Sequence, residues 1–298
     1  MTIKNVTIAG AGTLGSQIAY QSALKGMRVT VWNRHVESAE TRLHALKDAY
    51  HRDLKLSEAD FNAGMANIVA VTTDLREAVE DADLVIEAVP EAMEVKEAFY
   101  EELKAVVPDK TIVASNSSTF MPSQLVKFFG DPRRFLHIHF ANEIWKYNVA
   151  EIVSNPDTKP ELVEEVIDFA KAIGMVPIHL YKEQPGYVLN LLLIPFLDAA
   201  MALWVNGIAS PHEIDKDWMI STGSPSGPFI ILDTVGLRTA YQISLNKHQA
   251  TGDEMAKQVA DKLKEMIDAG HYGREAGQGF YHYPDAEFLA PDFLKEVT

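Results

Sequence analysis

The chain has 298 residues, of which 47% are hydrophobic and 23% charged, as in a globular protein with room for two domains. Its formal net charge of -15 argues against binding a nucleic-acid backbone and gives no attraction to an anionic membrane. It contains no cysteine, which excludes disulfides and thiolate zinc sites. Because no signal peptide precedes the first strand pattern, we expect a cytoplasmic protein.

Short β-branched runs alternate with amphipathic stretches in the first part of the chain. The predicted strands cover residues 4–10, 28–32, 67–71, 83–89, 110–115, 134–140, 148–153 and 176–180. Helical patterns lie between them, for example over residues 14–26, 94–107 and 160–174. Strands that alternate with helices indicate βαβ units. We therefore predict an α/β fold with a Rossmann-type, doubly wound and mostly parallel sheet.

The pattern changes after Pro185 and Gly186, where strand patterns nearly vanish and helical ones extend to about residue 270. We predict a dinucleotide-binding domain over residues 1–184 and a smaller all-helical domain over residues 185–298, for substrate binding and dimerisation. The apolar run over residues 188–205 contains Pro195 and Asp198 and has no flanking basic cluster. It is therefore expected to be a buried helix and not a membrane span.

The segment "GAGTLG", from Gly10 to Gly15, matches the pattern G-x-G-x-x-G between a predicted strand and a predicted helix. Gly10 permits the tight turn, Gly12 lets a pyrophosphate approach the backbone, and Gly15 lets helix and strand pack closely. The phosphates would meet the positive end of the helix dipole. This context predicts a bound dinucleotide, NAD or NADP.

The second strand ends "VWNRH", with Asn33 and Arg34 where an acidic residue usually binds the adenosine ribose. Asn33 removes the repulsion of a 2′-phosphate and can still bond a ribose hydroxyl. Arg34 can reach a 2′-phosphate with a charge-assisted contact. The expectation is NAD(P)H as cofactor, with NADPH weakly favoured over NADH.

Two further polar motifs follow later strands. "SNSSTF" follows the fifth predicted strand, where a hydroxyl can bind a substrate oxygen or cap the next helix. In "HIHFANEIWKYNVAEIV", His139 and Glu151 lie at the ends of a loop between two strands. Such a pair can transfer protons near neutral pH, or be a core histidine with a solvated glutamate. His137 shares a face with His139, but without a further ligand we expect no metal.

Read together and in order, the motifs "GAGTLG", "EAVPE", "SNSST", "HFAN", "AEIV", "PGYVLN", "GSPSGPFIILDTVGL" and "GQGFYHY" resemble the 3-hydroxyacyl-CoA dehydrogenase family over essentially the whole chain. "HFAN" followed by tryptophan looks most like the diketoreductase branch. The resemblance implies a homodimeric oxidoreductase that transfers a hydride between NAD(P) and a 3-hydroxyacyl or 3-ketoacyl substrate.

The resemblance also implies residue roles. His139 would be the general acid/base and Glu151 its orienting carboxylate, while Ser118 and Asn190 would hydrogen-bond the reacting oxygen. The residues expected to line the nicotinamide half of the cofactor pocket are Glu91, Lys96 and Asn142.

This chain departs from the family's pattern beside the histidine, where Trp145 and Tyr147 are expected to narrow the pocket. The segment after the second strand, where the family's basic CoA contacts lie, has Arg42, Lys47, Arg52 and Lys55 among many acids and no distinct basic cluster. A free β-keto acid, ester or diketone is therefore the alternative to a CoA thioester. An inactive dinucleotide-binding sensor is the alternative from another class.

Overall fold

The computed structural model describes residues 3–295 of the chain. They form two compact units, of which the first ends at Val188 and the second begins at Leu189. Each unit has a hydrophobic core of its own.

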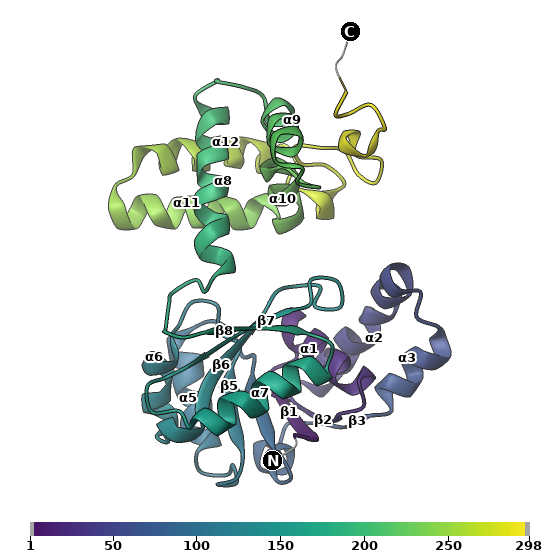
Figure 1. Ribbon diagram of the computed structural model, residues 1–298, viewed down its shortest axis with the longest axis vertical. Coiled ribbons are helices and arrows are strands. Elements are labelled where there is room, and N and C mark those ends of the chain that lie inside the picture. The colour runs from purple at the N-terminus through teal and green to yellow at the C-terminus, as the bar shows by residue number, and fades with distance from the viewer. Residues whose placement is uncertain (1–2, 296–298) are drawn as a thin grey trace. The chain divides into compact units, whose positions relative to one another are not determined.

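The first unit is built on one eight-stranded sheet (Figure 1). Its strands are β1 (Asn5–Ala9), β2 (Arg28–Trp32), β3 (Ile68–Thr72), β4 (Leu84–Glu87), β5 (Ile112–Ser115), β6 (Phe135–Phe140), β7 (Val149–Ser154) and β8 (Val176–Leu180). They lie in the order β3-β2-β1-β4-β5-β6-β7-β8, and each neighbouring pair is parallel except β6 and β7. The predicted doubly wound, mostly parallel sheet is confirmed. The strand order reverses at β1 and β4, where such sheets bind ligands beyond their carboxyl ends.

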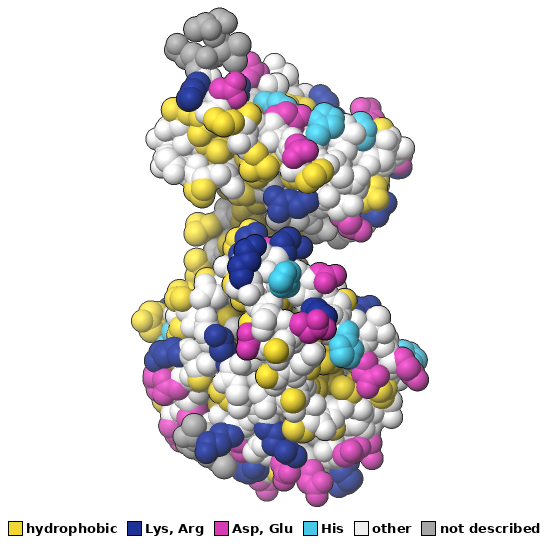
Figure 2. Space-filling model, turned by 90° about the vertical axis from the view of Figure 1, so that its right-hand side faces the viewer, with side chains coloured by type: hydrophobic (Ala, Val, Ile, Leu, Met, Phe, Trp, Pro, Cys, Tyr) yellow, Lys and Arg dark blue, Asp and Glu magenta, His cyan; other side chains and the backbone are white. Residues whose placement is uncertain are grey.

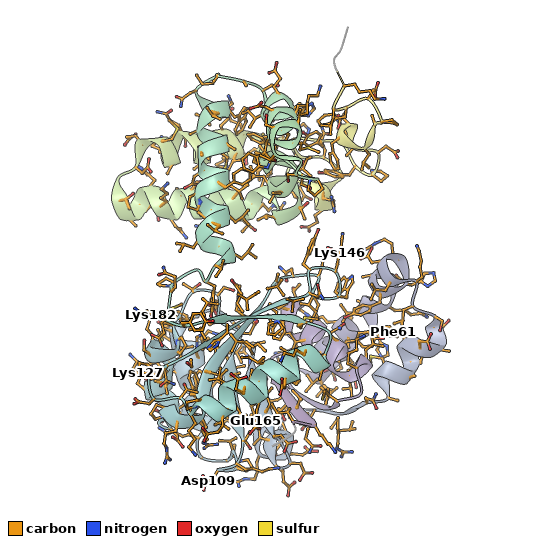
Figure 3. The ribbon with its side chains drawn as sticks, in the orientation of Figure 1. Phe61, Asp109, Lys127, Lys146, Glu165 and Lys182 are labelled. Atoms are coloured by element: carbon orange, nitrogen blue, oxygen red, sulfur yellow. The ribbon has the colours of Figure 1, made fainter. Side chains whose placement is uncertain are left out.

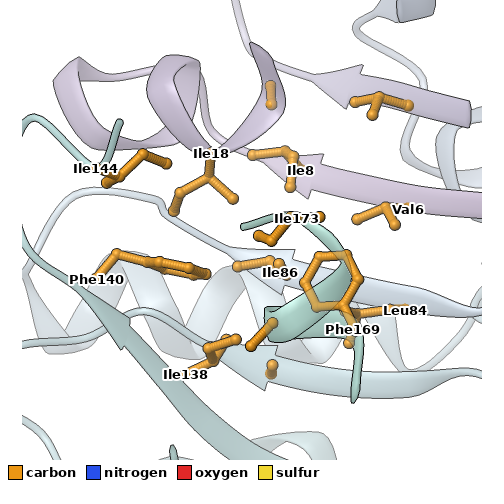
Figure 4. Close-up of a cluster of buried hydrophobic side chains, with 14 of the residues drawn as sticks. Val6, Ile8, Ile18, Leu84, Ile86, Ile138, Phe140, Ile144, Phe169 and Ile173 are labelled. Carbon is orange, nitrogen blue, oxygen red and sulfur yellow. The ribbon is translucent and has the colours of Figure 1, made fainter. Parts of the chain in front are cut away.

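Helices cover both faces of this sheet. They are α1 (Thr13–Leu24), α2 (Val36–Leu54), α3 (Glu58–Met65), α4 (Leu75–Val79), α5 (Met93–Leu103), α6 (Pro122–Phe129) and α7 (Pro160–Ala172). One hydrophobic cluster joins the sheet to α1, α2, α3 and α7, and a second joins it to α4, α5 and α6. In the first, Ile8 of β1, Ile86 of β4 and Ile138 of β6 are fully buried (Figure 4). Each such side chain stabilises the fold by about 1.5–3 kcal/mol.

The second unit is helical, as predicted. Its helices are α8 (Leu189–Val205), α9 (Pro211–Thr222), α10 (Pro228–Val235), α11 (Leu237–Thr251) and α12 (Glu254–Asp268). Its core contains buried side chains of α8, such as Leu197 and Met201, but Leu192 of the same helix is 69% exposed. The expectation that this helix is buried all round is therefore only partly met within the unit. In the described part of the chain, none of the helices is long and apolar enough to cross a membrane.

Candidate active site

The glycine-rich loop joins β1 to α1, as its pattern predicted. Gly10 has φ of 105°, and a Cβ there would lie 2.5 Å from the carbonyl oxygen of Ala88. A Cβ on Gly15 would lie 1.9 Å from the carbonyl oxygen of Gly10. A Cβ on Gly12, by contrast, meets no atom within 4 Å. Gly10 and Gly15 are thus needed for packing within the protein, whereas Gly12 leaves its backbone open to an approaching pyrophosphate.

A pocket of about 750 Å³ adjoins this loop and fits the dinucleotide pattern. It is lined by the loop, by the end of β2 including Asn33 and Arg34, by Arg42 of α2 and by one side of α5. Its volume lies within the range usual for cofactor pockets.

Asn33 makes contacts that the sequence did not reveal. Its Oδ1 accepts a hydrogen bond of 3.0 Å from the backbone N–H of Ala11, and its Nδ2 donates one of 2.8 Å to the carbonyl of His35. The side chain therefore holds the glycine-rich loop to the end of β2. Arg34, next along the chain, is exposed and lines the pocket.

The two residues of the predicted proton relay lie opposite each other on β6 and β7. The antiparallel register pairs His139 with Glu151, and both side chains are buried. Nδ1 of His139 lies 2.9 Å from Oε2 of Glu151, and Nε2 lies 3.1 Å from Oγ of Ser118. A carboxylate only accepts hydrogen bonds, so Nδ1 carries a proton and donates it to Glu151. In the neutral imidazole, Nε2 is then the basic atom and accepts from the Ser118 hydroxyl.

An ion cluster centred on the buried side chain of Lys96 lies at the end of β4 and the start of α5. Nζ of Lys96 lies 2.7 Å from Oε1 of Glu87 and 3.0 Å from Oε2 of Glu91, and Lys96 and Glu87 are fully buried. Glu91 also accepts hydrogen bonds from the Ser117 hydroxyl and the Thr119 backbone N–H. Burial alone would raise the pKa of Glu91, yet Lys96 and these donors hold it below its usual value. The cluster thereby fastens the loop after β5, which carries Ser118, to β4 and α5.

Glu87 was missed by the sequence analysis, although it lies inside a strand that was predicted to be buried. A carboxylate in such a strand is rarely left unpaired, and this was the observation that could have revealed the cluster.

Tyr187 was also missed. Its ring stacks on the imidazole of His139, with ring centres 4.4 Å apart and an interplanar angle of 8°. The next residue, Val188, donates its backbone N–H to Oε1 of Glu151 over 2.8 Å. Nothing in the local pattern of "PGYVLN" indicates that this aromatic ring folds back onto the sheet.

The loop between β6 and β7, marked by Lys146 in Figure 3, carries the remaining predicted residues of this region. Asn142 follows β6 and is exposed. Trp145 packs on Tyr50 of α2 with ring centres 4.7 Å apart, and its Nε1 donates to Asp53 over 3.0 Å. Trp145 is thus engaged with α2, and Tyr147 is the exposed aromatic of the loop.

Asn190 is the second residue of α8 and belongs to the second unit. It follows Val188, which touches Glu151, by two positions in the chain. Its place beside the reacting oxygen stays a prediction.

Comparisons with known proteins agree with this architecture. Residues 5–184 match the model of the 3-hydroxyacyl-CoA dehydrogenase NAD-binding domain, and residues 186–283 match that of the C-terminal domain of the same family.

Among curated relatives, a probable 3-hydroxyacyl-CoA dehydrogenase of Caenorhabditis elegans is 31% identical over 94% of this chain and 93% of its own. A probable 3-hydroxybutyryl-CoA dehydrogenase of Bacillus subtilis is 31% identical over 96% of this chain and 99% of its own.

Two solved structures are also similar. A diketoreductase, studied for its catalysis on dicarbonyl compounds, has a TM-score of 0.89 and 46% identity over 95% of this chain and 100% of its own. An (S)-3-hydroxybutyryl-CoA dehydrogenase of Ralstonia eutropha has a TM-score of 0.80 and 29% identity over the same shares. The chain belongs to the 3-hydroxyacyl-CoA dehydrogenase family of NAD-binding oxidoreductases that act on CH–OH groups.

Proposed function

We propose that this chain interconverts the hydroxyl and keto groups at C3 of a small acyl compound, with His139 as general acid/base. The observation that carries the proposal is the buried pair of His139 and Glu151, whose imidazole contacts Ser118. The glycine-rich loop follows β1 of the same sheet. No other atom lies within 4 Å of a Cβ built on Gly12, which leaves the backbone there accessible to a dinucleotide.

The proposed steps follow from the donors and acceptors of the site. The bound dinucleotide supplies or accepts a hydride at nicotinamide C4. In oxidation, Nε2 of His139 takes the proton of the 3-hydroxyl as C3 loses its hydride, and Glu151 stabilises the imidazolium. In reduction, His139 returns that proton, while Ser118 and Asn190 donate hydrogen bonds to the developing oxyanion.

We further propose that residues 1–184 hold the cofactor and the catalytic pair, and that residues 185–298 complete the substrate site. Glu91, Lys96 and Asn142 would border the nicotinamide. The cytoplasmic location stays a prediction.

Two of the four cations between residues 42 and 55 are paired with carboxylates, which favours a substrate without CoA. Lys47 forms an ion pair with Glu58. Two nitrogens of Arg52 donate hydrogen bonds to the two carboxylate oxygens of Asp53, over 2.8 and 2.9 Å. The face of the first unit shown in Figure 2 mixes Lys and Arg with Asp and Glu side chains. Cations that are already paired with carboxylates attract the phosphates of CoA weakly.

The first prediction concerns the substrate. We expect kcat/KM to be at least about tenfold higher for a diketo ester than for acetoacetyl-CoA, since tenfold corresponds to one lost charged contact. The measurement is steady-state kinetics with acetoacetyl-CoA, free acetoacetate and a diketo ester, each with NADH and NADPH. Fastest turnover of acetoacetyl-CoA would assign the CoA thioester instead. No turnover of any of them would favour a dinucleotide-binding sensor.

The second prediction concerns the proton relay. His139→Ala should lower kcat by about 10²–10⁴-fold and leave cofactor affinity nearly unchanged. Glu151→Gln should do similar damage, because an amide does not stabilise the imidazolium. A matched control is His179→Ala on β8. His179 pairs with Ile152, the neighbour of Glu151 on β7, so its side chain lies on the face of the sheet opposite to that of Glu151. If either site variant kept kcat within a few-fold of wild type, the relay would be wrongly assigned.

The third prediction concerns the cofactor, for which we propose a weak preference for NADPH. Arg34 and Arg42 both line the pocket, and the residue at the end of β2 is an amide. A charged hydrogen bond to a 2′-phosphate contributes about 1.5–3 kcal/mol. The double variant Asn33→Asp, Arg34→Ile should therefore shift the kcat/KM ratio toward NADH by about tenfold or more. Arg28→Ile, at the other end of β2, is the control. A wild-type preference for NADH above tenfold would refute this role of Arg34.

The fourth prediction concerns assembly, for which we propose a homodimer formed largely by the C-terminal units. Leu192 and other apolar side chains of α8 are exposed within their unit, and such a helix face is stabilised by a partner. Leu192→Glu should dissociate the dimer in sedimentation velocity while circular dichroism stays unchanged. Leu54→Glu, an equally apolar exposed position in the first unit, should leave the dimer intact. A wild-type monomer at micromolar concentration would contradict the proposal.

A further inference from the structure

A chain of buried hydrogen bonds anchors the ring of Tyr187. Its hydroxyl donates to the backbone carbonyl of Ser117 over 2.5 Å and lies 3.0 Å from Nδ1 of His137. A tyrosine hydroxyl has one proton, and a carbonyl can only accept. His137 must therefore donate from Nδ1 to the Tyr187 oxygen. Burial lowers the pKa of His137 well below its usual value, which keeps this imidazole neutral with its one proton on Nδ1.

The anchored ring lies flat against the imidazole of His139. His139 makes a hydrogen bond through each ring nitrogen, to Glu151 at Nδ1 and to Ser118 at Nε2. They hold the two nitrogens in place, but a hydrogen bond tolerates some angular deviation and so resists a tilt of the ring about the line joining the nitrogens only weakly. A parallel neighbour with its centre 4.4 Å away and an angle of 8° restricts the tilt. Because the lone pair of Nε2 does not lie along the line between the two nitrogens, the tilt decides where this lone pair points.

The backbone of the same dipeptide holds the other member of the pair. Tyr187 has φ of 55°, which is uncommon for a residue with a bulky side chain. In this conformation its ring covers His139 while the N–H of Val188 reaches Glu151. Such strained backbone positions concentrate at functional sites.

We propose that Tyr187, anchored by His137, is a positioning residue that sets the tilt of the catalytic imidazole. This proposal rests on the function proposed above, because it assumes that His139 transfers the proton. Tyr187 acts through His139 and does not itself exchange a proton with the substrate, since its own proton is committed to Ser117.

The test compares Tyr187→Leu, which removes the ring, with Tyr187→Phe, which keeps the ring and removes its anchor. We expect kcat to fall by about 10- to 100-fold in Tyr187→Leu, the order of loss that follows a small misplacement of a catalytic group. Tyr187→Phe should recover part of this loss. In both variants KM should change less than about threefold, and the solvent deuterium isotope effect on kcat should increase, because the proton step becomes slower.

The matched control is Tyr20→Phe. Tyr20 is another fully buried tyrosine of the first unit, and its hydroxyl donates to the carbonyl of Phe61. All rates are expressed per site that binds cofactor, counted by fluorescence titration. A merely structural role of Tyr187 would reduce the number of such sites but leave kcat per site and the isotope effect at the values of Tyr20→Phe. That result would overturn the proposal.

The outcomes also separate this proposal from the function on which it rests. If His139→Ala is inactive and Tyr187→Leu has wild-type kcat and isotope effect, the positioning role fails and the proposed function stands. If His139→Ala is active, the proposed function fails. If Tyr187→Leu yields no cofactor-binding protein, Tyr187→Phe decides, and a wild-type kcat and isotope effect in that variant would overturn the positioning role.

Discussion

The site depends on one antiparallel strand pair within an otherwise parallel sheet. Parallel strands need a long crossover connection, whereas β6 and β7 are joined by a short loop. Their register sets His139 directly opposite Glu151, so the hydrogen bond of 2.9 Å follows from the backbone ladder itself. The strand that carries the histidine also pairs with β5, which leads into the loop of Ser118. The reversal of strand direction thus sets His139 against Glu151, and the parallel pairing of β5 with β6 brings the loop of Ser118 to the same histidine.

The segment that leaves the first unit reinforces this pair. Tyr187 covers one face of the His139 imidazole. The backbone N–H of Val188 donates to Oε1 of Glu151, while His139 donates to the other oxygen, Oε2. Both nitrogens of His139 and both carboxylate oxygens of Glu151 therefore have a hydrogen-bond partner. In the reaction that we propose, such preorganisation lowers the reorganisation needed as charge moves onto the imidazole.

The sequence predicted the architecture well, because buried parallel strands are apolar and β-branched, and helices show their period locally. It also predicted His139 and Glu151 near one another, since both flank one loop. It did not reveal the two bonds of Asn33 to the glycine-rich loop, nor the ring of Tyr187 on the histidine. These contacts join residues whose relation depends on tertiary packing. Nor did the sequence reveal that the indole of Trp145 donates a hydrogen bond to Asp53 on α2.

The buried Lys96 and Glu87 show why this region is polar where an apolar core would be simpler. Removing two charges from water costs several kcal/mol per ion, and well-packed apolar residues of similar volume are often at least as stable. Contacts between apolar side chains, however, are not directional and do not fix the orientation of the groups that make them. Glu87 accepts from Lys96, the Val89 backbone and the Ser115 hydroxyl, and Lys96 in turn holds Glu91. These directional bonds fix the ends of β4 and β5 together, and with them the loop that presents Ser118 to His139.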